Sequence, residues 1–146
     1  YEVSAYARDK RRCVHNLNYW SFGDYLGIGA GAHAKLTMAD GSVRRRWKTR
    51  HPRAYLEAAT HAARIGGDSV VDTRELPFEY MLNALRLVDG TPLDDFSART
   101  GLAAETLRKP LEAAVARDWL RVDDGRLRAT ALGQRFLNDV VASFIA

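Results

Sequence analysis

A histidine that precedes two aromatic residues by four and five positions is the first candidate for chemistry in this sequence. His15 is followed directly by Asn16, and Tyr19 and Trp20 complete the hexapeptide. A neutral imidazole is a common axial ligand of haem iron, and aromatic rings offer apolar surface to a flat porphyrin. We therefore consider His15 a candidate metal ligand, with Asn16 orienting the imidazole or the backbone. In the structural alternative, His15 hydrogen-bonds near a strand end while Tyr19 and Trp20 belong to the core.

A glycine-rich stretch at residues 27–33 is the second candidate site. Glycine has no side chain, so such a backbone can approach a ligand closely. The glycine spacing differs from that of a dinucleotide-binding fingerprint, and no helix clearly follows. A tight turn between a strand and a hairpin is the structural alternative. The residues expected at a ligand pocket are Gly27, Gly29, Gly31, Ala32 and His33, the last as a hydrogen-bonding group of the pocket wall rather than a metal ligand.

The densest basic cluster lies just beyond this stretch. It consists of Arg44, Arg45, Arg46, Lys48, Arg50 and Arg53, with Trp47 among them. On a strand, Arg44, Arg46 and Lys48 share one face, opposite Arg45 and Trp47. Haem propionates, an anionic protein, nucleic acid or a merely solvated strand face would each explain the cluster.

The remaining metal-ligand types are sparse. Cys13 is the only cysteine, which excludes an internal disulfide and a three-cysteine iron–sulfur motif within these residues and indicates a reducing, cytoplasmic location. Cys13 lies two residues before His15 and is able to bind iron, although lone cysteines are more often bystanders. His51 and His61 are expected at the start and on the surface of a helix, with no ligand spacing between them.

Composition and charge indicate a globular protein with two different halves. The chain has 146 residues, of which 47% are hydrophobic and 27% charged, and no apolar run of about 18 residues predicts a membrane span. Residues 1–67 carry 12 Lys and Arg against 5 Asp and Glu (+7), and residues 68–146 carry 10 against 13 (−3). The sequence begins without Met or a signal peptide, so we expect a piece of a longer protein, entered in mid-domain.

The first half must position both candidate sites. Residues 1–6 alternate like a strand, and residues 24–33 are expected to form a strand that enters the glycine-rich turn. Asp40-Gly41 predicts a hairpin between strands near 34–38 and 43–48.

A helix and a linker are expected to end this half. Pro52 opens a helix whose alanine-rich body, 55–65, stops at Gly66-Gly67. Residues 66–74 are expected to be a linker, which gives domains at 1–67 and 68–146.

The second half has the element order of a winged-helix domain. The expected elements are a helix from Pro77 to Gly90, a short helix from Thr91-Pro92 to Gly101, a helix over 103–118 kinked by Pro110, a hairpin over 119–129 and a last helix capped by Thr130. The expected inward residues are Phe78, Met81, Leu82 and Leu85, then Leu107, Leu111 and Val115, and finally Leu132, Phe136, Leu137, Val140, Val141 and Phe144.

Three stretches together resemble one protein family. They are His15-Asn16-Leu17-Asn18-Tyr19-Trp20, Gly23-Asp24-Tyr25-Leu26-Gly27-Ile28-Gly29-Ala30-Gly31-Ala32-His33 and Lys48-Thr49-Arg50-His51-Pro52. The second half adds Leu85-Arg86-Leu87 with Gly90, Thr100-Gly101-Leu102 and Arg108-Lys109-Pro110. In this order they resemble the radical S-adenosylmethionine (radical SAM) haem chaperones of the HemW type, which are related to oxygen-independent coproporphyrinogen III oxidases.

The resemblance implies an α+β fold: the last strands of a partial TIM-like radical-SAM barrel, followed by a winged-helix-like C-terminal domain. It implies that the longer parent protein binds S-adenosylmethionine and a [4Fe–4S] cluster through a cysteine triad that this chain lacks, so the chain alone should be inactive. It places the 27–33 stretch near the S-adenosylmethionine pocket. It also implies haem binding at the hexapeptide and delivery of haem to acceptor proteins, with oxidative decarboxylation of porphyrin propionates as the alternative.

A nucleic-acid-binding winged helix is the competing function. Its recognition helix, 103–118, carries Arg108, Lys109 and Arg117 against Glu105, Glu112 and Asp118. DNA readers normally present a basic face to the phosphates. The balanced charge therefore disfavours nucleic acid, and leaves a purely structural or partner-docking domain as a third interpretation.

Overall fold

The computed structural model describes residues 1–8 and 11–145 and divides into two compact units. Unit 1 combines Tyr1–Phe22 with Thr73–Ala146, and unit 2 is Gly23–Asp72. Both contain helices and a small sheet, in agreement with the expected α+β class. The expected division after residue 67 falls inside a strand of unit 2.

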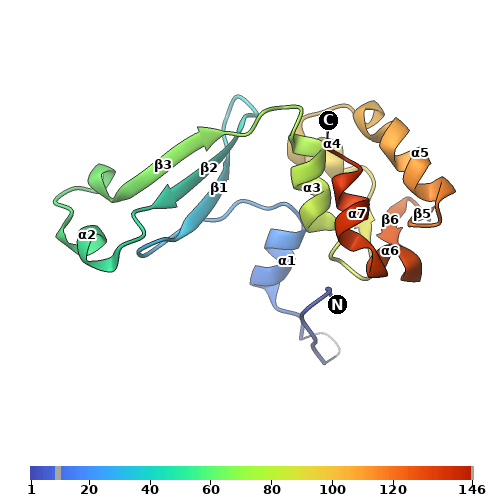
Figure 1. Ribbon diagram of the computed structural model, residues 1–146, viewed down its shortest axis with the longest axis horizontal. Coiled ribbons are helices and arrows are strands. Elements are labelled where there is room, and N and C mark those ends of the chain that lie inside the picture. Colours follow the sequence, from blue (N-terminus) through green and yellow to red (C-terminus); the bar gives the residue numbers. More distant parts are fainter. Residues whose placement is uncertain (9–10, 146) are drawn as a thin grey trace. The chain divides into compact units, whose positions relative to one another are not determined.

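Unit 2 is built on an antiparallel sheet with the strand order β1-β2-β3 (Figure 1). The strands are β1 His33–Thr37, β2 Val43–Lys48 and β3 Ile65–Val70. The predicted hairpin is confirmed as β1–β2. Its connection is closed by the side chain of Asp40, whose Oδ1 accepts hydrogen bonds from the Ser42 amide at 2.9 Å and the Ser42 hydroxyl at 2.7 Å.

The linker predicted at residues 66–74 is wrong, because Ile65–Val70 forms β3 and pairs with β2. The glycines that suggested a linker are needed by the sheet. A Cβ atom at Gly67 would collide with the indole ring of Trp47 on the neighbouring strand. Tertiary packing thus explains a Gly-Gly pair that local propensity assigns to a loop.

The helix predicted to start at Pro52 is confirmed at its start but is shorter than expected. Helix α2 spans Pro52–Glu57, and a separate 3-10 turn covers Ala62–Arg64. The His51 ring accepts a hydrogen bond from the Ala54 amide at 3.5 Å. No residue of α2 is buried, and without an apolar face to pack, an alanine-rich segment gains too little to extend further.

The strands predicted at residues 1–6 and 24–33 are not formed. Glu2 makes isolated bridges to Ala5 and Leu87, and Tyr25 makes one to Lys35. The Glu2 carboxylate accepts a hydrogen bond from the Ser4 amide at 2.9 Å, which turns the chain back after two residues. A local side-chain bond of this kind competes with extended pairing.

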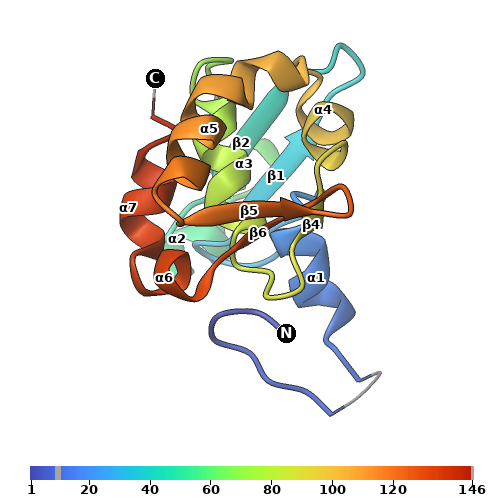
Figure 2. The ribbon, with the colours of Figure 1, turned by 90° about the vertical axis from the view of Figure 1, so that its right-hand side faces the viewer.

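Unit 1 consists of helices around a second small sheet with the order β4-β6-β5 (Figure 2). The helices are α1 Val14–Trp20, α3 Leu76–Ala84, α4 Asp95–Thr100, α5 Arg108–Ala116, α6 Ala131–Arg135 and α7 Leu137–Ala142. The strands are β4 Thr91–Pro92, β5 Leu120–Asp123 and β6 Arg126–Ala129.

The core of unit 1 centres on α3. Tyr80 contacts Phe22 and Phe96 edge to face, with ring centroids 5.6 and 5.3 Å away, and all three side chains are buried. The Tyr80 hydroxyl lies 3.3 Å from Thr91 Oγ1 on β4. Met81 and Leu85 are buried as predicted, whereas Leu82 is 46% exposed because Leu76, Tyr80 and Ala84 supply the inward face.

The expected kink at Pro110 is wrong because the helix begins later than predicted. Residues Ala104–Leu107 form a 3-10 turn, and α5 starts at Arg108, so Pro110 lies in the first helical turn. An amide there has no acceptor within the helix, and proline is tolerated. Of the expected inward residues, Leu107 is buried but Val115 is 43% exposed.

The predicted hairpin over 119–129 and the cap of the last helix are confirmed. Strands β5 and β6 are joined by Asp124 and Gly125, both with positive φ, as a two-residue hairpin turn requires. Thr130 Oγ1 accepts a hydrogen bond from the Gly133 amide at 3.0 Å. The last helix is divided at Phe136 into α6 and α7, which leaves Phe136 45% exposed rather than in the core.

Candidate functional site

Helix α1 displays the histidine and the tyrosine of the hexapeptide together. His15 and Tyr19 lie one turn apart, with ring centroids 4.6 Å apart and planes at 87°. The His15 side chain is exposed. An exposed imidazole keeps a nitrogen lone pair accessible, so His15 can accept a metal centre without displacement of a core contact.

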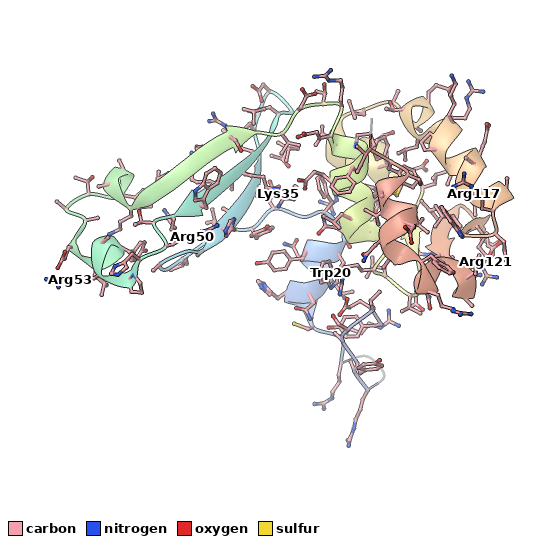
Figure 3. The ribbon with its side chains drawn as sticks, viewed as in Figure 1. Trp20, Lys35, Arg50, Arg53, Arg117 and Arg121 are labelled. Atoms are coloured by element: carbon pink, nitrogen blue, oxygen red, sulfur yellow. The ribbon has the colours of Figure 1, made fainter. Side chains whose placement is uncertain are left out.

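Asn16 and Trp20 form a second pair on α1 and anchor the helix. The Asn16 side-chain amide donates to the Tyr1 hydroxyl at 3.1 Å. The Trp20 ring, labelled in Figure 3, is covered by the Arg86 guanidinium at 4.4 Å from the ring centroid. The indole Nε1 is buried and has no hydrogen-bond partner within the described structure. The hexapeptide therefore contains two pairs with different roles. His15 and Tyr19 contact each other, with His15 exposed, whereas Asn16 and Trp20 anchor the helix.

A buried carboxylate holds the arginine that covers Trp20. Glu2 is 3% exposed, and its Oε2 lies 3.0 Å from Arg86 Nη2 and 3.1 Å from Arg86 Nε. Burial raises the pKa of the Glu2 carboxyl, but hydrogen bonds from Ser4 and the nearby Arg86 charge outweigh this effect and lower the pKa. Sequence reasoning missed both residues as supports of α1, since 84 positions separate them.

The glycine-rich stretch of unit 2 folds closely onto its own backbone. A Cβ atom at Gly27 would lie 2.5 Å from the His33 carbonyl oxygen. The Gly31 amide donates to the Thr49 carbonyl, and the Ala32 carbonyl accepts from the Lys48 amide, both at 2.9 Å. The glycine at position 27 is thus required by the chain itself.

A carboxylate ties the segment before the glycines to β1. Asp24 Oδ1 lies 2.8 Å from the Lys35 ammonium, and Asp24 Oδ2 accepts from the Thr37 amide at 2.8 Å. Burial raises the pKa of Asp24, but the hydrogen bonds from Lys35 and Thr37 outweigh it and lower the pKa. The Lys35 side chain is only 2% exposed, so this pair fixes the start of the stretch.

His33 and the other stretch residues face different surroundings. Gly27 and Ala32 line a pocket of unit 2, but His33 is not among its lining residues. His33 is exposed and stacks on Trp47, with centroids 6.5 Å apart and planes at 26°. The histidine among the lining residues of this pocket is His61, and a pocket-wall role of His33 in the longer protein stays a prediction.

The basic cluster is largely paired within the sheet. Asp68 on β3 lies 3.4 Å from Arg44 Nε and 2.6 Å from Arg46 Nη2. Arg45 donates to the Tyr25 hydroxyl at 3.0 Å. Lys48 differs from these arginines because it is only 8% exposed. The strand arginines are therefore partly exposed and paired, whereas Lys48 is buried.

Residues 1–8 and 11–145 hold no group of three or more His, Cys, Asp or Glu side chains suited to a metal ion. Cys13 is exposed at the N-terminus of α1, and its side chain makes no capping hydrogen bond. Nor does any helix among these residues have the length and apolar character to cross a membrane.

Comparison with known proteins shows which proteins this chain is similar to. The heme chaperone HemW of Escherichia coli is 40% identical over 146 residues, and that of Mycobacterium tuberculosis (strain ATCC 25618 / H37Rv) is 35% identical over 146. The sequence is similar to HemW-type heme chaperones. Residues 71–136 match the family model of the HemN C-terminal domain.

The chain spans only about a third of the length of these two proteins. The matches span 99–100% of this chain but 38% of the E. coli protein and 34% of the M. tuberculosis protein. The structure also resembles that of the E. coli coproporphyrinogen III oxidase HemN, a radical SAM enzyme, with a TM-score of 0.56 and 13% identity over 85% of this chain and 29% of that one. At this identity the likeness concerns the fold alone.

Proposed function

We propose that this chain binds haem through His15 and takes part, within a longer HemW-type protein, in the delivery of haem to acceptor proteins. The observation that carries the proposal is the exposed imidazole on α1, beside the Tyr19 ring and on a helix held by Arg86 and Asn16. The related E. coli and M. tuberculosis proteins are named heme chaperones.

The residues of α1 fit a haem group in type. His15 would supply an axial nitrogen to the iron, and the Tyr19 ring would offer apolar contact to the macrocycle. Trp20 would mainly anchor α1 rather than contact the macrocycle, because Arg86 covers its ring. When bound, the haem would be a cargo that the chain holds and releases.

A haem titration tests the role of His15. We expect the wild-type chain to produce a saturable Soret band and His15→Ala to weaken binding at least tenfold. His51→Asn is the matched control, because His51 is also exposed and asparagine can keep its capping role at α2. Equal haem affinity and an unchanged Soret position in His15→Ala would refute the assignment.

For the longer protein we propose a radical-SAM parent that binds S-adenosylmethionine and a [4Fe–4S] cluster. This chain has one cysteine, so the three cluster thiolates would come from elsewhere and the chain alone would be inactive. The stretch from Gly27 to His33 would lie near the S-adenosylmethionine pocket at the end of a partial barrel. A cysteine triad upstream, with an iron–sulfur absorption band in the longer protein, would test this proposal.

We further propose that residues 73–146 form a winged-helix-like domain that serves structure or docking in the cytoplasm. The sheet order β4-β6-β5 and the hairpin after α5 support it. Arg128 lies 2.6 Å and Arg121 3.0 Å from Asp123, and Arg108 contacts Glu105, so these basic side chains are committed to nearby acids. Binding of nucleic-acid phosphates by this domain is accordingly disfavoured. A salt-sensitive change in the fluorescence anisotropy of labelled duplex DNA would overturn this view.

A further inference from the structure

A pocket in unit 2 combines apolar walls with a cationic end. It has a volume of about 170 Å³ and lies on the sheet face that carries Ala34 and Leu36. Its lining residues are Leu26, Gly27, Ile28, Ala32, Ala34, Leu36, Arg46, Lys48 and His61. A cavity of about 150 Å³ holds a benzene molecule. The pocket is therefore large enough for one small organic group.

The burial of Lys48 is not explained by a negatively charged partner in the part of the chain that the structure describes. Its side chain is buried to more than nine-tenths, and its Nζ atom lies 3.5 Å from the Nε2 atom of His61. Within the described residues no carboxylate lies within ion-pair distance of Lys48, and the nearest strand acid, Asp68, contacts Arg44 and Arg46 instead. A buried ammonium is costly unless an anion compensates it.

The backbone holds Lys48 at the pocket. The pairing of β2 with β3 shifts register between Trp47 and Lys48, a bulge of the kind that redirects a side chain. The Lys48 amide also donates to the Ala32 carbonyl at 2.9 Å, which fastens the strand end to the glycine-rich stretch. The lysine is thus positioned by two neighbouring segments.

The apolar walls of the pocket favour an anion that carries an apolar group. Leu26 and Ile28 are 74% and 89% exposed at the rim, and Ala34 and Leu36 form the sheet side. A free phosphate would bury none of this apolar surface, whereas an apolar carboxylate would cover it and place its charge against Lys48. Arg46 adds little because Asp68 already contacts its guanidinium at 2.6 Å.

We propose that this pocket binds a carboxylate carried on an apolar group, with Lys48 as the charge partner and the His61 imidazole as a second polar contact. The carboxylate has two chemical sources, a free apolar acid and a propionate arm of a porphyrin, and only the second source rests on the proposed function.

Titration of the ¹⁵N-labelled full chain with sodium benzoate tests the site. We expect saturable shifts of the Ala32, Ala34 and Lys48 amides, with benzamide and inorganic phosphate binding at least tenfold more weakly. Lys48→Met should abolish the response, and Lys48→Gln provides a second variant if the first unfolds by circular dichroism. Arg50→Met is the matched control, because Arg50 belongs to the same cluster but is exposed (Figure 3). Equal affinity for benzoate and benzamide, or benzoate binding that survives in folded Lys48 variants, would overturn the proposal.

A second titration separates the two sources. If a propionate occupies the pocket, Lys48→Gln should weaken the binding of haem but not of haem dimethyl ester. If a free acid occupies it, Lys48→Gln should lose benzoate and keep haem affinity. His15→Ala should leave benzoate binding intact, so failure of the haem site and failure of this pocket give different results.

Discussion

Replacement of Glu2 by glutamine tests how helix α1 is supported. The change preserves size but removes the charge that Arg86 contacts at 3.0 Å. It also brings an amide NH₂ group toward the guanidinium, where two donors would face each other. We expect Arg86 to leave its place over Trp20 and α1 to loosen.

The cost follows from the burial of the two partners. Removal of one member of a fully buried ion pair costs about 3–5 kcal/mol. The Glu2 side chain is 2% exposed but Arg86 is 26% exposed, so water recovers part of the arginine's solvation. Glutamine also keeps an acceptor for Ser4. We therefore expect a loss of about 2 kcal/mol from the free energy of unfolding of unit 1.

The assay is urea denaturation followed by circular dichroism, repeated from pH 7 to pH 3. The folded-state pKa of Glu2 is lowered, so its contribution is fully present above the unfolded carboxyl pKa of about 4 and is lost as the pH falls through the lower folded value. The difference between wild type and Glu2→Gln should therefore shrink toward pH 3.

Glu57→Gln is the control, because Glu57 makes an exposed pair with Arg53 one helical turn away. Such pairs contribute less than about 1 kcal/mol. If Glu2→Gln proved no more destabilising than Glu57→Gln at pH 7, or if its effect did not change with pH, the proposed support of α1 would be refuted.

Three further changes probe other parts of the chain. Gly67→Ala should destabilise unit 2 by about 1–3 kcal/mol in urea denaturation because the new methyl group meets the Trp47 ring; unchanged stability would mean that the ring moves freely. Pro110→Ala should alter stability by less than about 1 kcal/mol because Pro110 lies in the first turn of α5; a gain near 3 kcal/mol would indicate a strained interior proline. Asp24→Asn should remove an acid-sensitive part of the stability of unit 2, since the lowered pKa of Asp24 adds stability above pH 4 that is lost on acidification; identical acid unfolding curves would contradict this role.

Local signals predicted the parts of the fold that local chemistry determines. The hairpin turns at Asp40-Gly41 and Asp124-Gly125 and the Thr130 cap are formed as expected. The strand at Ile65–Val70 was missed because its Gly-Gly pair resembles a linker, and the Trp47 ring that requires glycine at position 67 comes from another strand.

The contact within the candidate site also follows from local spacing. His15 was proposed as a ligand from its residue type and its spacing to Tyr19, and the structure places these two rings in contact; its role as a ligand stays a prediction. The supports of α1 were not predicted, because Glu2 and Arg86 meet only through the fold. Lys48 was grouped with the neighbouring arginines by strand alternation, but a bulge and a pocket give it a different environment.

The interrupted path of unit 1 has a consequence for biosynthesis. The chain leaves unit 1 after Phe22 and returns at Thr73, so α1 emerges from the ribosome well before α3 and Arg86. A nascent polypeptide that ends at Asp72 already contains every strand of the first sheet, but the partners of Glu2 and Trp20 have not yet been translated. Closing a loop of this length carries an entropic cost that only the finished contacts offset. The histidine-bearing segment therefore becomes anchored late, after the hairpin unit has had time to fold.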